Sequence, residues 1–127
     1  MPQTAKVFLI LGGFNAALVV LLGAFGAHGL KARMTTEMLT VYQTGVHYHL
    51  FHALGLLAVG LVTIQTSGSA YLKWSGWLML VGIILFSGSL YVLSVSGQRW
   101  LGMVTPFGGM SFIVAWILFV VAIMKSP

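Results

Sequence analysis

Charged side chains are scarce in this sequence, and acidic ones are almost absent. Only 6% of the 127 residues are charged, whereas 59% are hydrophobic, and Glu37 is the one acid. Soluble domains carry roughly 25% charged residues. Because this composition cannot supply the charged surface that a soluble domain needs, the sequence predicts a membrane protein.

Other absences exclude whole classes of function. The chain has no cysteine, which excludes disulfides, thiolate nucleophiles and cysteine-ligated zinc. A single acid cannot form a catalytic carboxylate pair, and a Ser-His-Asp arrangement lacks its aspartate. No phosphate-binding glycine loop and no dinucleotide fingerprint occurs. We therefore expect no enzymatic activity and no cofactor.

The six basic residues are scattered instead of forming a patch. Each stands at the edge of an apolar run, where long basic side chains reach lipid head groups. They are Lys6, Lys31, Arg33, Lys73, Arg99 and Lys125. This spacing favours membrane lipid as the partner and argues against nucleic acid.

Four long apolar runs determine the predicted fold. They cover about residues 7–27, 50–64, 74–95 and 103–124. About 20 helical residues cross a hydrocarbon core about 30 Å thick. Three runs reach that length, and His47, Tyr48 and His49 extend the second. We predict one domain, residues 1–127, that is an all-α membrane protein with four transmembrane helices in one bundle. Three bases then lie on each side, so charge does not determine the orientation.

The segment between the first two runs has a helical pattern of its own. Apolar and small residues recur there at helical spacing, at Met34, Met38, Val41, Tyr42 and Gly45. Thr36 is a plausible N-cap, and Glu37 suits the first turn. We predict a short interfacial amphipathic helix. The alternative is a connector that packs on the end of the bundle.

Small residues indicate where the helices approach one another, because lipid tails give helices no hydrophobic reason to associate. The predicted packing positions are Gly12, Ala16, Gly23, Gly88, Gly108 and Gly109. They favour a tight bundle or the seam of an oligomer. Asn15 is polar and lies inside the first run, so we expect it to bond to a residue of the third or fourth helix.

The four histidines lie at the end of the first run and the start of the second. Three interpretations remain open for them. The imidazoles form structural hydrogen bonds at the bundle ends, they handle protons, or His28, His49 and His52 ligate a metal. No carboxylate or thiolate stands near them to complete a metal shell, so we expect no metal site.

Four short stretches carry a resemblance to a known family. They are GAFGAHGL at 23–30, HYHLFHALGLL at 47–57, FSGSLY at 86–91 and TPFGG at 105–109. In this order they resemble the YgdD-like family, catalogued as domain of unknown function 423. The resemblance implies a small four-helix, multi-pass protein of the bacterial inner membrane, without a secure biochemical activity. His47 and His49 stand where family members carry other residues, which weakens the metal interpretation.

The alternating direction of the four helices suggests a candidate site. Because successive helices cross the membrane in opposite directions, the first and third end at one membrane face. The second and fourth begin at that same face. We therefore predict a polar cluster there of His28, His52, Ser87, Ser89, Tyr91 and Thr105.

Two functions follow from this predicted cluster. One is a non-enzymatic structural or accessory component, either a homo-oligomer or part of a larger membrane complex. The other is binding or transport of a small ligand, ion or proton through the cluster. Transport predicts a wet polar cavity, whereas a packing role predicts a dry core with His28 and His52 bonded to protein.

Overall fold

The chain is helical along almost its whole length. The computed structural model describes residues 1–66 and 68–127, and no strand occurs in these ranges. The elements are α1 (Gln3–Phe25), the π-helical turn η1 (Gly26–Leu30), α2 (Thr36–Thr66), α3 (Ala70–Gly82), the π-helical turn η2 (Ile83–Ser87), α4 (Gly88–Ser96), the 3-10 turn η3 (Arg99–Met103) and α5 (Thr105–Lys125).

Four helical stretches are long and apolar enough to cross a bilayer. They are Gln3–Leu30, Thr36–Thr66, Ala70–Ser96 and Arg99–Lys125. The shortest have 27 residues, or about 40 Å at the helical rise of about 1.5 Å per residue. Each exceeds a hydrocarbon core of about 30 Å. The structure therefore confirms the prediction of four transmembrane helices.

The separate interfacial helix predicted between the first two crossings is not found. Residues 36–66 form one unbroken helix, and only the five residues 31–35 lie between it and η1. No proline interrupts the polar first turns of α2, so they continue directly into its apolar part. The cap is also displaced from its predicted position: Thr35, not Thr36, accepts a bond on Oγ1 from the Met38 N–H, at 3.1 Å. Glu37 lies in the first turn, as predicted.

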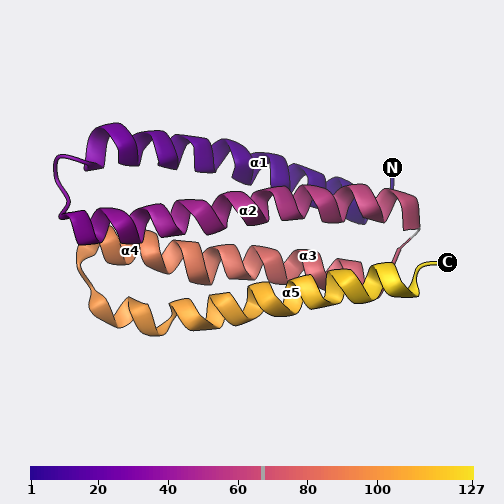
Figure 1. Ribbon diagram of the computed structural model, residues 1–127. Coiled ribbons are helices and arrows are strands. Elements are labelled where there is room, and N and C mark those ends of the chain that lie inside the picture. The colour runs from indigo at the N-terminus through magenta and orange to yellow at the C-terminus, as the bar shows by residue number, and fades with distance from the viewer. Residues whose placement is uncertain (67) are drawn as a thin grey trace.

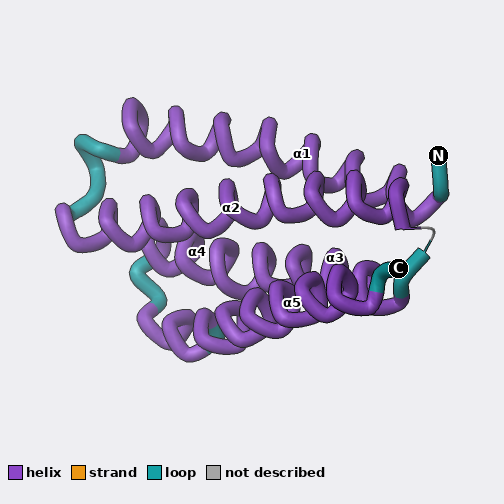
Figure 2. The backbone as a smooth tube through the Cα atoms, turned by 45° about the vertical axis from the view of Figure 1, so that its right-hand side comes forward, coloured by secondary structure: helices purple, strands orange, loops and turns teal. Residues whose placement is uncertain are grey.

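The helices form an up-and-down bundle with both termini at one end (Figure 1). In the views of Figures 1 and 2, α1 lies along α2, and α2 in turn packs against α3 and α4. The last helix, α5, packs along α3. The outer position of α1 and α5 leaves their far sides free to face lipid.

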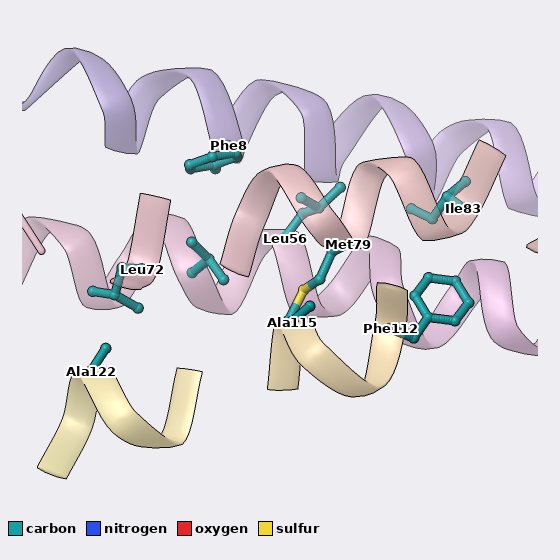
Figure 3. Close-up of a cluster of buried hydrophobic side chains, with 9 residues drawn as sticks. Phe8, Leu56, Leu72, Met79, Ile83, Phe112, Ala115 and Ala122 are labelled. Carbon is teal, nitrogen blue, oxygen red and sulfur yellow. The ribbon is translucent and has the colours of Figure 1, made fainter. Parts of the chain in front are cut away.

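The core lies where α2, the α3–η2 stretch and α5 meet, with one ring contributed by α1 (Figure 3). Its buried members are Phe8, Leu56, Val59, Leu72, Met79, Ile83, Phe112, Ala115 and Ala122. Two glycines of the third stretch make room for aromatic rings. A Cβ on Gly76 would lie 2.5 Å from the Phe8 ring, and a Cβ on Gly82 would collide with the Phe112 ring. The rings therefore rest directly on the helix backbone.

The two connections at α3 and α4 depend on glycine. Gly97 has a φ of 73° and closes α4 by donating its N–H to the Leu93 carbonyl, at 2.8 Å. Gly68 has a φ of 90°, and Ser69 caps α3 by accepting a bond from the Leu72 N–H. Both glycines therefore lie in connections between transmembrane helices. Ser67, next to Gly68, lies outside the described residues.

Candidate functional site

A chain of hydrogen bonds crosses three helices near the middle of α1 and α2. His49 of α2 is 2% exposed, and Asn15 of α1 is 6% exposed. His49 Nε2 lies 2.9 Å from Asn15 Oδ1, and His49 Nδ1 lies 2.8 Å from the Tyr91 hydroxyl of α4. We call Asn15, His49 and Tyr91 the polar chain.

Donor and acceptor chemistry fixes the direction of each bond in the polar chain. Asn15 Nδ2 donates to the Leu11 carbonyl at 2.8 Å, and that carbonyl can only accept. Asn15 Oδ1 therefore faces His49, and His49 Nε2 carries the proton that it donates. A neutral ring then has a free lone pair on Nδ1, which accepts from the Tyr91 O–H. Each atom that bonds within the polar chain is therefore either a donor or an acceptor, and the direction of both bonds is fixed.

The prediction for Asn15 was partly wrong. The side chain bonds to another helix, as expected, but its partner is His49 of α2 and not a residue of the third or fourth helix. The reason is positional, because α1 packs most extensively along α2. A polar side chain on the buried face of α1 therefore meets α2 first.

His52 has a second, separate set of partners. Trp116 Nε1 of α5 donates to His52 Nε2 at 2.9 Å, and His52 Nδ1 lies 2.7 Å from the Tyr48 carbonyl. Indole N–H groups only donate, so Nε2 accepts and Nδ1 carries the proton. The imidazole also stacks on the Phe112 ring, with centroids 3.5 Å apart. His52 thus holds the opposite tautomer from His49 and binds α2 to α5.

The serines of the third stretch meet α2 and α5. Ser87 is fully buried and donates to the Gly45 carbonyl at 2.8 Å. The Ser89 hydroxyl lies 2.6 Å from Thr105 Oγ1 at the start of α5. Ser87 ends the π-helical turn η2, whose extra residue shifts the positions of the side chains around it. The predicted proximity of Ser89 and Thr105 is found.

The predicted polar cluster does not form as one site. His28 is exposed on η1, and His52 lies deep in α2 beside Trp116. The prediction assumed that the second helix begins near His47, but it begins at Thr36. His52 is therefore about 24 Å from the start of its helix, at about 1.5 Å per residue. Tyr91 contacts His49, which lay outside the predicted cluster.

The three histidines considered as metal ligands are also dispersed. Within residues 1–66 and 68–127, no three side chains of histidine or acidic residues lie close enough to share an ion. Both ring nitrogens of His49 and of His52 already bond to protein groups. A ligand nitrogen needs a free lone pair, and these rings have none to offer.

Close helix packing involves only some of the predicted small residues. A Cβ on Gly12 would lie 2.8 Å from Leu57, and one on Gly108 would collide with the Phe86 backbone, so both are tight contacts. Ala16 is half-buried. The other three predicted positions are Gly23, Gly88 and Gly109. They are not tight contacts, because the atom nearest to an added Cβ would be 3.7 Å or more away. Five glycines where an added Cβ would lie less than 3.0 Å from another helix were missed: Gly26, Gly55, Gly60, Gly76 and Gly82.

The chain matches, over residues 22–109, the model of a family described as a protein of unknown function (DUF423). It belongs to this family. The resemblance drawn from the four motifs is therefore confirmed. No solved structure matches the chain.

Bacterial relatives of the same family cover nearly the whole chain. The chain is 53% identical to the UPF0382 membrane protein YwdK of Bacillus subtilis, over 94% of this chain and 98% of the relative. It is 45% identical to a UPF0382 membrane protein of Staphylococcus saprophyticus, over 94% and 98%. These names and the four apolar helices fit a multi-pass protein of the bacterial plasma membrane.

Proposed function

We propose that this protein is a non-enzymatic structural or accessory component of the bacterial plasma membrane. The observation that carries the proposal is the use of the buried imidazoles. All four ring nitrogens of His49 and His52 bond to protein groups that belong to neighbouring helices or to α2 itself. Histidines used in this way hold helices together, and their nitrogens are not free for a ligand.

The same geometry weighs against transport through the candidate residues. A groove of about 760 Å³ lies between η1, the end of α1 and the first half of α2. Neither His49, His52, Ser87 nor Ser89 lines it. Among the residues that the structure describes, no buried side-chain nitrogen or oxygen lacks a hydrogen-bond partner. Buried polar groups that are all paired are typical of a packed core.

The polar side chains are also poorly arranged for catalysis. The side chain of Glu37, the one acid, is 70% exposed and lies 4.0 Å from Arg99, at the bundle end. The Ser75, Ser87 and Ser111 hydroxyls donate to backbone carbonyls of other helices. A serine nucleophile needs a neighbouring base instead.

A flux measurement tests the proposal. Purified protein would be reconstituted into vesicles that enclose a pH-sensitive dye, and a proton gradient would be applied across the membrane. We expect the dye to respond as it does in protein-free vesicles, for the wild type and for His49→Leu alike. Proton flux in the wild type that His49→Leu abolishes would contradict the proposal.

A second measurement tests the accessory role itself. Phe14 lies on the outer side of α1 and is 65% exposed. A photo-reactive amino acid at this position should give one discrete cross-linked protein product in intact membranes, either a second copy or another protein. Cross-linking to lipid alone would contradict a role in an assembly.

A further inference from the structure

The groove between α1 and α2 has two kinds of wall. On the α1 side it is lined by small residues, Gly23, Gly26 and Ala27. On the α2 side it is lined by longer residues, which include Gln43, His47 and Phe51. Its volume of about 760 Å³ lies in the range of about 300–1,000 Å³ that is typical of small-molecule sites.

Tyr42 explains why the groove exists. Its ring lies directly on Gly26, where a Cβ would collide with it, and its hydroxyl donates to the Leu22 carbonyl at 2.5 Å. The ring therefore lies between η1 and α2 and holds them apart. Beside it, Gly23 has no side chain, and an added Cβ would meet only Val46 Cγ1, at 3.7 Å. The space next to the Tyr42 ring is left unfilled and opens toward lipid.

The groove has the height of one lipid leaflet. Its lining on α2 runs from Thr40 to Phe51, or about 16 Å at about 1.5 Å per residue. This is about half of a hydrocarbon core of about 30 Å. The apolar run of the first helix ends near Ala27, and Gly26 packs against Tyr42. The edge of the hydrocarbon core therefore crosses α2 near Tyr42, so Gln43 lies at head-group level and Phe51 lies deeper.

The head-group end of the groove is suited to an anion. Gln43 and His47 are exposed and lie one turn apart on the same face of α2. Neither side chain bonds to a protein group among the residues that the structure describes. Lys31 follows Ala27 by one helical turn at this end. The one acid nearby, Glu37, pairs with Arg99, which leaves the charges of Lys31 and Arg33 without a protein counter-ion.

We propose that the groove binds one anionic phospholipid. An acyl chain lies along Gly23, Val46 and Phe51, and the phosphate accepts hydrogen bonds from Gln43, His47 and Lys31. Lipid tails gain no hydrophobic free energy by leaving other tails. Selection therefore comes from the charge of the head group and the fit of the chain. This site is independent of the structural role proposed above.

Native mass spectrometry tests the site. Wild-type protein would be reconstituted in vesicles of equimolar dioleoyl phosphatidylglycerol and dioleoyl phosphatidylcholine. The vesicles would be dissolved in detergent, and the protein would be released from the detergent in the mass spectrometer. We expect one phosphatidylglycerol molecule per chain to be retained. Gly23→Leu places a side chain in the groove, where the Cβ would meet only Val46 Cγ1 at 3.7 Å, and should lower the lipid-bound fraction at least about tenfold. Gly13→Leu is the matched control, because Gly13 is exposed on the same helix with open space around it.

A second variant and its control test whether the basic charge at the head-group end selects the anionic lipid. Lys31→Gln should reduce the preference for phosphatidylglycerol over phosphatidylcholine about fivefold. This factor corresponds to the attraction of about 1 kcal/mol between one basic residue and an anionic membrane surface. Lys73→Gln, at the opposite end of the bundle, should leave the preference unchanged. If Gly23→Leu fails to fold, Ala27→Leu fills the same groove.

Three results would overturn the proposal. The first is equal retention by Gly23→Leu and Gly13→Leu, and the second is equal retention of the two lipids by the wild type. The third is a wild-type dimer that Gly23→Leu dissociates, which would make a second copy the occupant of the groove.

Discussion

Replacing Tyr91 by phenylalanine is a precise perturbation of the polar chain. The change removes one oxygen, which lies 2.8 Å from His49 Nδ1, and keeps the ring that packs against Tyr42. His49 is only 2% exposed, so water cannot replace the lost donor. A buried group left unpaired costs about 1–3 kcal/mol, whereas hydrogen bonds between membrane helices average about 0.6 kcal/mol, with a maximum near 1.7. We expect Tyr91→Phe to lower the unfolding free energy by about 1–2 kcal/mol.

A double-mutant cycle separates this bond from ordinary packing. His49→Leu leaves both Asn15 Oδ1 and the Tyr91 hydroxyl without their partner, so its cost should exceed that of Tyr91→Phe. The double variant should cost less than the sum of the two, by about 1 kcal/mol, because the hydroxyl is no longer left unpaired. Unfolding would be followed by helical circular dichroism in detergent. The control is Tyr71→Phe, at an exposed ring beneath Lys125. The reasoning is refuted if Tyr91→Phe behaves like this control or if the two costs are additive.

Three further predictions use the same unfolding assay. Trp116→Phe removes the donor to the second buried imidazole and should cost about 1–3 kcal/mol, whereas Trp100→Phe, at an exposed ring, should not change stability. Gly108→Ala places a methyl group against backbone and should cost about 1–3 kcal/mol, while Gly13→Ala, in open space, should leave the fold intact or stabilise it. Glu37→Gln breaks an exposed ion pair and should change stability by less than about 1 kcal/mol; a larger loss would mean that the pair closes the bundle end.

The transmembrane helices could be predicted because the bilayer imposes their length and apolar character. Runs of apolar residues were enough to place four crossings. The start of α2 could not be placed in the same way. Its first turns are polar, and the change from polar to apolar at Leu50 suggested a helix boundary where the backbone has none.

The side-chain partners were harder to predict than the helices. Asn15, His49 and Tyr91 were each singled out from the sequence, but their bonds to one another were not. Those bonds depend on how far each helix is rotated about its axis and on how deep each residue lies, neither of which an apolar run reveals. Ser89 and Thr105 were correctly brought together because both stand near helix ends, where the alternating direction of the helices alone determines which residues are neighbours.

The central claim is that the buried histidines are structural, with every ring nitrogen bonded to protein. Nitrogen-15 NMR of histidine-labelled protein in lipid tests this claim most directly, because the chemical shifts of the two ring nitrogens report which one carries the proton. Our account predicts opposite tautomers, with the proton on Nε2 in His49 and on Nδ1 in His52. Exposed His28 should instead give signals averaged by exchange with water. Averaged signals from His49 and His52, or the same tautomer in both, would contradict the account.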